Sequence, residues 1–91
     1  KYNCTKFEEE DGMITLSTEV LDLVENGDTE EFAKNKMAES ILEYAKEFYG
    51  EYDLWSNASN RKNHIPYVFK ALLLNDVSKI GDLIVCQDGK N

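Results

Sequence analysis

The residues that could do chemistry in this chain are few and lie far apart in the sequence. Cys4, His64 and Cys86 are the only soft metal ligands besides two methionines, and they lack the close spacing of a zinc site. One histidine gives no Ser-His-Asp or Cys-His arrangement for nucleophilic catalysis. The two cysteines, 82 positions apart, are expected to be buried, reduced thiols rather than a disulfide. We therefore predict no enzyme, no metal and no cofactor.

Charge is the second chemical signal. The net charge is −8, and residues 1–59 carry five lysines against fifteen carboxylates, whereas residues 60–91 have a net charge of +2. An acidic body disfavours general nucleic-acid binding, because neutralisation of phosphates supplies most non-specific affinity. It favours association with a basic protein, although a merely solvated acidic surface has the same composition.

Two groups of carboxylates are candidate contacts for such a basic partner. One group lies in an expected hairpin turn, and the other lies along the outward side of an expected long helix, where a spacing of four residues aligns the side chains. The candidate residues are Glu8, Glu9, Glu10, Asp11, Glu39, Glu43 and Glu47.

The one basic cluster, residues 60–64, supports an alternative interpretation as a nucleic-acid-binding transcriptional regulator. It precedes Pro66 at an expected helix start, where backbone N–H groups favour anions. The candidate contacts with nucleic acid are Arg61, Lys62 and His64. An exposed basic linker that balances neighbouring acids is the simpler explanation of the same residues.

A β-sheet is expected to position the first group of acids. Residues 2–8 are rich in β-favouring side chains, Asp11-Gly12 is a strong hairpin signal, and residues 13–17 alternate apolar and polar side chains. A third strand is expected over residues 19–25, although a helical turn near Thr18 would also explain its apolar side chains. Asn26-Gly27 then predicts a tight turn.

A long helix of about six turns is expected to follow and to end at Gly50. Asp28, with Glu31 three residues on, predicts a capping box at its start. One apolar face is expected to pack on the sheet as core. That face comprises Ala33, Met37, Ile41, Tyr44 and Phe48, widened by Leu42, Ala45 and Tyr49.

Residues 51–91 are expected to form a helical extension. A short helical turn or an ordered loop is expected over residues 51–57, and Pro66 predicts the first turn of a second helix. Residues 68–74 are almost wholly apolar, which predicts burial around much of that helix. Asp76 or Ser78 is expected to cap a last helix to about residue 85, with a strand over residues 83–86 as the alternative. The polar residues 87–91 are expected to fray.

These elements predict one α+β domain over residues 1–91, composed of a β-meander with a long helix (1–50) and a helical extension (51–91). The fold class is a three- to four-stranded antiparallel sheet packed by one long helix. No apolar stretch reaches the length of a membrane span, and no apolar signal-peptide region follows the first residues, so a cytoplasmic location is expected. An exposed edge strand would favour a homodimer.

The order of these motifs resembles the HicB-like antitoxin domain over about the first 49 residues. The motifs are Tyr2…Phe7, Glu10-Asp11-Gly12, Ile14/Leu16, Leu21…Leu23 and Gly27-Asp28-Thr29-Glu30-Glu31. The second half looks like an extension found in some short bacterial relatives. The resemblance implies an α+β fold and a non-catalytic role in a toxin–antitoxin system, in which the protein binds and neutralises a small basic ribonuclease toxin. DNA binding is not carried over, because residues 51–91 contain no convincing ribbon-helix-helix or helix-turn-helix.

Overall fold

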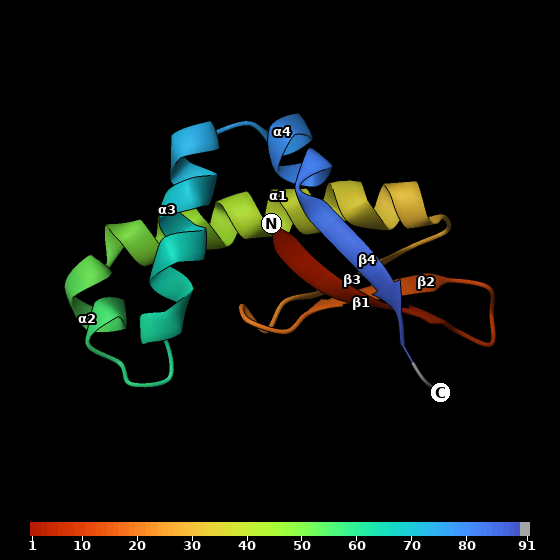
Figure 1. The fold of residues 1–91 in the computed structure, drawn as a ribbon, viewed down its shortest axis with the longest axis horizontal. Coiled ribbons are helices and arrows are strands. Elements are labelled where there is room, and N and C mark those ends of the chain that lie inside the picture. The colour runs from red at the N-terminus through yellow and green to blue at the C-terminus, as the bar shows by residue number, and fades with distance from the viewer. Residues whose placement is uncertain (90–91) are drawn as a thin grey trace.

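Residues 1–89, which the computed structural model describes, form four strands, four α-helices and one 3-10 turn. In chain order these are β1 (Tyr2–Glu8), β2 (Ile14–Thr18), β3 (Val24–Gly27), α1 (Glu30–Gly50), α2 (Tyr52–Ser56), η1 (Lys62–His64), α3 (Ile65–Leu74), α4 (Val77–Asp82) and β4 (Ile84–Asp88). Figure 1 shows α1 running along the sheet and continuing beyond it to α2 and α3.

The sheet has the strand order β3-β2-β1-β4, so β1 is a central strand. β1–β2 and β2–β3 are antiparallel, whereas β4 lies parallel to β1. The predicted α+β fold with one long packing helix is confirmed. The sheet is mixed rather than wholly antiparallel, because α3 and α4 carry the chain back to the beginning of β1, where the Tyr2 N–H donates to the Leu83 C=O at 2.9 Å.

The first hairpin forms as predicted, but the third strand begins later than predicted. Gly12 occupies the left-handed region (φ +88°) that the turn requires. After β2, the Thr18 hydroxyl accepts from the Leu23 N–H at 2.9 Å, and Asp22 adopts φ +56°, so residues 19–23 form a loop instead of a strand. The prediction of a strand over residues 19–25 was therefore wrong for residues 19–23.

Gly27 is part of β3 rather than of a tight turn, so the predicted Asn26-Gly27 turn is wrong. A Cβ atom on Gly27 would lie 2.7 Å from the Phe32 ring and 2.9 Å from the Ala33 nitrogen. Glycine is thus required here for close approach of β3 to α1. Because β3 extends through Gly27, the helix cap falls one residue later than predicted.

The N-cap of α1 is Thr29, whose hydroxyl accepts from the Phe32 N–H at 3.1 Å. The predicted capping box of Asp28 and Glu31 is therefore wrong. The acidic first turn, Glu30 and Glu31, is nevertheless present and complements the helix dipole.

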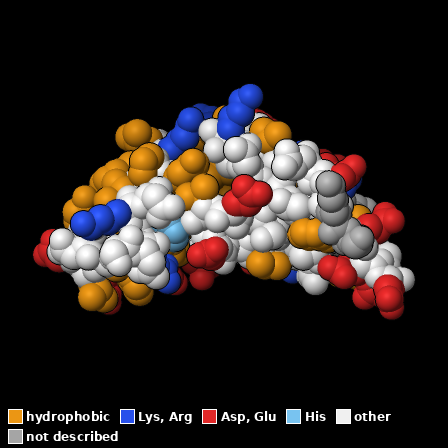
Figure 2. Space-filling view, turned by 60° about the horizontal axis from the view of Figure 1, so that its bottom comes forward, with side chains coloured by type: hydrophobic (Ala, Val, Ile, Leu, Met, Phe, Trp, Pro, Cys, Tyr) orange, Lys and Arg blue, Asp and Glu red, His pale blue; other side chains and the backbone are white. Residues whose placement is uncertain are grey.

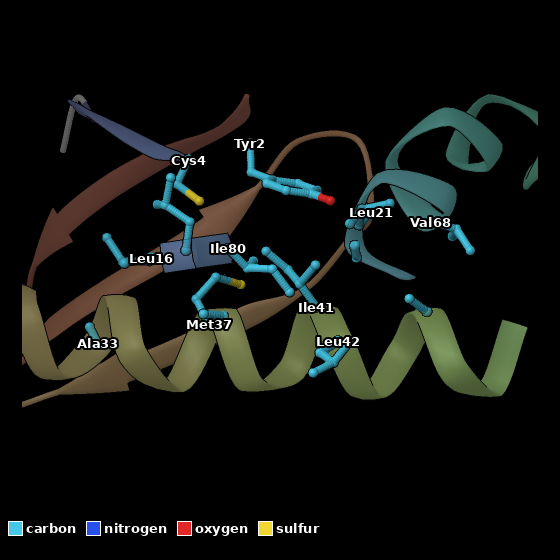
Figure 3. Packing of buried hydrophobic residues seen from close by; sticks show 14 of the residues in the cluster. Tyr2, Cys4, Leu16, Leu21, Ala33, Met37, Ile41, Leu42, Val68 and Ile80 are labelled. Carbon is cyan, nitrogen blue, oxygen red and sulfur yellow. The ribbon is translucent and has the colours of Figure 1, made fainter. Parts of the chain in front are cut away.

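The core lies between the sheet and the inward face of α1 (Figure 3). Figure 3 shows Met37 and Ile41 of the helix facing Leu16, Cys4 and Tyr2 of the sheet. The buried residues of α1 are Ala33, Met37, Ala38, Ile41, Leu42, Ala45 and Phe48, close to the predicted set. Tyr49 is an exception at 63% exposed, although its neighbour Phe48 in the same last turn of α1 is buried, so Tyr49 lies outside the buried face.

The segment after Gly50 departs most from prediction. Only Val68 and Ala71 of α3 are buried, so the predicted burial around much of this helix is wrong. Asp76 caps α4 by accepting from the Lys79 N–H at 3.1 Å, as predicted, but α4 ends at Asp82. The chain then forms β4, the strand that the sequence left as an alternative. Residues 87–88 belong to β4, and the last two residues of the predicted frayed tail, 90–91, lie outside the described residues.

Candidate protein-binding surfaces

The two cysteines are direct neighbours across the β1–β4 ladder, where Cys4 pairs with Cys86. Both are free thiols, and Cys4 is buried. Burial, and secondarily the nearby Cys86, raises the pKa of the Cys4 thiol to about 12, and burial also raises the pKa of Cys86. Both groups are thus protonated at neutral pH, which makes them poor nucleophiles and poor metal ligands. Among residues 1–89, no cluster of three potential metal ligands occurs.

His64 and Arg61, two of the three candidate nucleic-acid contacts, are held within the helical part of the molecule. The Tyr44 hydroxyl lies 2.6 Å from His64 Nδ1 and accepts from Arg61 Nη1 at 2.8 Å. The Arg61 guanidinium also stacks 4.6 Å from the centre of the Trp55 ring. His64 is only 2% exposed, whereas Lys62 is exposed. These contacts give Arg61 and His64 a packing role.

Burial lowers the pKa of His64, and the adjacent Arg61 lowers it further. The imidazole is therefore neutral at pH 7. A neutral ring can accept the Tyr44 O–H at Nδ1, which leaves the Tyr44 oxygen free to accept from Arg61. The sequence did not reveal this network, because Tyr44, Trp55 and His64 are distant along the chain.

The predicted partner-binding acids form two separate exposed surfaces. The acidic row comprises Glu39, Glu43 and Glu47 on the outward side of α1, and the acidic hairpin comprises Glu8, Glu9, Glu10 and Asp11. The hairpin lies near the start of α1, because Glu8 pairs with Ile14 and Ile14 pairs with Gly27. The row begins nine residues after Glu30, which is ~14 Å along the helix axis. The structure therefore does not bring the two groups together.

The acids of these two surfaces differ from other acids nearby in that the others form ion pairs. Within the described part of the chain, Lys6 pairs with Glu30 at 2.8 Å, Lys34 pairs with Glu30 at 3.7 Å, and Lys36 pairs with Glu25 at 3.9 Å. The hydrogen bond from Lys6 lowers the pKa of Glu30. None of the seven carboxylates of the acidic row and the acidic hairpin has an ion-pair partner in residues 1–89.

An exposed apolar surface at the far end of α1 is a feature that the sequence interpretation missed. Figure 2 shows hydrophobic side chains gathered over this end of the molecule. We define the helical-end apolar surface as Tyr49, Tyr52, Leu54, Phe69 and Leu73, the last of which is 86% exposed. The available signal was the apolar run 68–74, which holds more large side chains than one face of a helix can bury.

A groove lies between the start of α1 and α4, beside β4. Its volume is about 580 Å³, and it is largely open to solvent. We call it the α1–α4 groove, and it is lined by Glu30, Glu31, Lys34, Asn35, Ser78, Gly81, Asp82 and Ile84. With three carboxylates and one lysine, the lining has a net negative charge.

No helix within residues 1–89 has both the length and the apolar character needed to cross a membrane.

Comparison with known proteins identifies the family. A family model named PHD_like, described as "Antitoxin of toxin-antitoxin, RelE / RelB, TA system", matches residues 1–86. Among solved structures, this chain is similar to a crystal structure described as an antitoxin part of a candidate toxin/antitoxin system from Syntrophomonas wolfei subsp. wolfei. The two are 34% identical with a TM-score of 0.91, and the match covers 98% of this chain and 64% of that chain. A search of curated proteins found no match.

The resemblance to HicB-like domains thus predicted the right class of protein, an antitoxin, but the comparisons do not specifically support the HicB-like family. The present chain spans less than two thirds of the length of the Syntrophomonas antitoxin. The family model covers nearly all of this sequence, from β1 into β4. The chain belongs to the PHD_like family, the antitoxins of RelE/RelB-type toxin–antitoxin systems.

Proposed function

We propose that this chain is a non-catalytic antitoxin that binds a small basic toxin protein and neutralises it in the cytoplasm. The observation that carries the proposal is the set of seven exposed carboxylates, in the acidic row and the acidic hairpin, that have no ion-pair partner within residues 1–89. A cationic toxin would supply the missing charges.

The acidic row is the proposed centre of the contact. It lies on a 21-residue helix whose opposite side is packed on the sheet, so the three carboxylates are presented by a rigid element. Like charges four residues apart on a helix repel one another, at a cost of about 0.2–0.5 kcal/mol per pair. A bound cationic surface would relieve this repulsion and would also speed association at low salt.

The acidic hairpin is the proposed second contact. Its separation from the row along α1 means that a partner touching both must extend along most of that helix. The acidic hairpin also enlarges the negative field around the sheet, so its removal would slow association even where it makes no direct contact. A homodimer is a further prediction, which sizing of the free protein would test.

The test begins with capture of the partner. The tagged full chain is used to isolate binding proteins from lysate of the source cell, and a small basic protein recovered in fixed ratio is identified by mass spectrometry. That protein is then expressed alone and together with the antitoxin. Growth arrest by the captured protein alone, with recovery on co-expression, supports the proposal. A captured protein that leaves growth unchanged contradicts it.

Charge reversal tests the proposed contact. The test variant carries Glu39→Lys, Glu43→Lys and Glu47→Lys. The control, with the same change in net charge at exposed positions outside both acidic surfaces, carries Glu19→Lys, Glu51→Lys and Asp53→Lys. At low salt, the test variant is expected to bind the toxin at least about tenfold more weakly than the control. Equal loss in both variants would mean that only the overall charge matters.

A further inference from the structure

β4 is an edge strand whose outer side has no partner. It pairs with β1 on one side only, within residues 1–89. Edge strands in stable monomers are commonly guarded by lysine, proline or a covering element. β4 contains no lysine or proline, and its one charged residue, Asp88, pairs with Lys6 of β1 at 3.4 Å. The edge is therefore open to an added strand.

The hydrogen bonds at the two ends of the β1–β4 ladder identify which backbone groups face outward. The Tyr2 N–H donates to the Leu83 C=O at 2.9 Å, and the Gly89 N–H donates to the Lys6 C=O at 2.7 Å. Along a parallel ladder, alternate residues of each strand bond to the neighbour. The N–H and C=O groups that point away from β1 therefore belong to Ile84, Cys86 and Asp88.

The same three residues place their side chains on the face of the sheet that carries α1. Ile84 and Cys86 pair with Tyr2 and Cys4, whose side chains lie in the core, and Ile84 lines the α1–α4 groove. A strand added to β4 would alternate in the same way. Every second side chain of that strand would thus project into the groove between α1 and α4.

Charge selects the chemistry of the added strand. Of the groove carboxylates, Glu30 is paired with Lys6 and Lys34, but Glu31 and Asp82 have no ion-pair partner within residues 1–89. Alternate lysine or arginine side chains would fit this groove. A second copy of this chain would instead bring the carboxylates of one groove toward those of the other, so the charges favour a basic partner over self-pairing.

The opposite edge of the sheet lacks these features. β3 has only four residues, and its Glu25 carboxylate is already engaged by the Ser40 hydroxyl and by Lys36. The lining of the α1–α4 groove includes no residue of β3. The two edges thus differ in what lies beside them.

We propose that the outer edge of β4 and the α1–α4 groove together bind an extended segment of the toxin, with basic residues at alternate positions, by strand addition. This inference rests on the proposed function, because the segment belongs to the toxin. It assigns the toxin a further contact, on the side of α1 where the chain returns through α4, in addition to the acidic row and the acidic hairpin.

Amide hydrogen exchange on the complex tests the strand addition directly. In the free protein, the amides of Cys86 and Asp88 should exchange faster than those of Val85 and Gln87, which bond to β1. Toxin binding is expected to slow exchange at Cys86 and Asp88 by about tenfold or more, because each amide then donates to the added strand. Unchanged exchange at both amides in a saturated complex would overturn the inference.

A matched pair of variants tests the backbone contact. Cys86→Pro removes an outward N–H that is not used by β1, whereas Cys86→Ala removes the same side chain and keeps the N–H. Toxin is expected to bind Cys86→Pro about tenfold more weakly than Cys86→Ala. If Cys86→Pro does not fold by circular dichroism, Asp88→Pro and Asp88→Ala provide the same comparison at the end of the strand. Equal affinity within the folded pair would overturn the inference.

The groove is tested with Glu31→Gln and Asp82→Asn combined, against a control carrying Glu51→Gln and Asp53→Asn at exposed positions of the helical end. The groove variant is expected to lose several-fold more affinity than the control at low salt, and equal losses would overturn the charge argument. If the intact antitoxin binds no toxin, the proposed function fails. If it binds toxin but the β4 and groove variants match their controls, only this inference fails. A complex in which β4 of two antitoxin copies pair would likewise overturn it.

Discussion

The sheet end and the helical end of this protein are stabilised in different ways, although one helix, α1, runs through both. At the sheet end, aliphatic side chains of α1 pack on strands that are joined by backbone hydrogen bonds. At the helical end, aromatic rings pack edge to face, with the centre of the Phe48 ring 6.0 Å from that of Tyr44 and 6.2 Å from that of Tyr52. Arg61 and His64 complete that cluster.

This difference indicates which end of the molecule should unfold locally first. α2 has no buried residue, and neither α2 nor α3 has a side-chain cap at its start. The helical end therefore depends on the side-chain cluster, while the sheet end also has a continuous ladder from β3 to β4. We expect the helical end to unfold locally at a lower free energy than the sheet. Its exposed apolar surface supports the same view, because the side chains of Tyr49, Leu54 and Leu73 are each more than half exposed and contribute little to folding.

The largest expected effect comes from Phe48→Ala. Phe48 is fully buried at the junction of α1 and α2, so its truncation should lower the free energy of unfolding by about 3–5 kcal/mol. Amide exchange in α2 and α3 should accelerate well before exchange in β1 and β2. Leu16→Ala, at the sheet end, is the control and should accelerate exchange in all elements together. If both variants accelerated amide exchange uniformly in all elements, the helical end would not unfold separately from the sheet end.

Alkaline pH should weaken the sheet end. Burial raises the pKa of Tyr2 and of Cys4 to about 12 in the folded protein, from ordinary values of 10 and 9. The unfolded chain therefore loses these protons first, and stability should fall as pH rises from about 9 to 12, by about 1.4 kcal/mol per pKa unit and group. Denaturant unfolding across this range measures the slope. Cys4→Ala should flatten it, and an unchanged slope in that variant would exclude Cys4 as a cause.

Acidic pH should weaken the helical end. Because burial lowers the pKa of His64, the unfolded chain takes up its proton first as pH falls below about 6.5. The stability contributed by neutral His64 is present above that pH and is lost below it. Nuclear magnetic resonance between pH 7 and 5 should show the helical end opening while β1 and β2 stay protected. His64→Gln should lose the pH dependence, and simultaneous loss of both ends would contradict the localisation.

Arg61→Ala should cost about 1 kcal/mol, because it removes the stack on Trp55 and the hydrogen bond to Tyr44. Lys62→Ala, one residue on and exposed, is the control and should change the free energy of unfolding by less than about 0.5 kcal/mol. A mobility-shift assay with the DNA upstream of the protein's own gene tests the alternative function, that of a nucleic-acid-binding transcriptional regulator. A shift that requires Lys62 as much as Arg61 would favour a nucleic-acid contact over the packing role.

The smallest effect is expected at the helical-end apolar surface. Leu73→Ser should change stability by less than about 0.5 kcal/mol, because the Leu73 side chain is 86% exposed. Val68→Ala, on the buried side of the same helix, should cost more than 1 kcal/mol, roughly as expected for a small core truncation. Thermal unfolding compares the two. A large loss of stability for Leu73→Ser would mean that the Leu73 side chain is covered in solution rather than exposed.

Local signals in the sequence predicted local structure well. The Asp11-Gly12 turn, the alternating residues of β2, Pro66 at the start of α3 and the Asp76 cap all act over a few residues, and each occurs as predicted. The errors concern features set by distant partners. The sequence predicts a turn at Gly27, but its small size serves the approach of α1 to β3.

The candidate contacts also divide into those that local sequence predicts and those that depend on residues distant in the sequence. The acidic row was predictable from spacing alone, because the period of a helix determines which residues share a side. The enclosure of His64 depends on its packing against Tyr44 of α1. The neighbourhood of Cys4 and Cys86 and the groove beside β4 both depend on the return of the chain to β1. Periodicity carries no information about that return. The exposure of α3 could not be predicted from the sequence either, because a run of apolar residues does not specify how much of the rest of the protein is available to cover that helix.

The parallel pairing of β4 with β1 has a consequence for biosynthesis. β1 leaves the ribosome well before β4, so one of its two hydrogen-bonding edges stays empty until residues 84–88 have also emerged. The nascent chain must therefore keep β1 with an open edge while the residues between β1 and β4 are translated, supported only by the hairpin and α1. Any truncation or proteolytic cut that removes β4 would return the protein to that state, with Cys4 beside an unpaired edge.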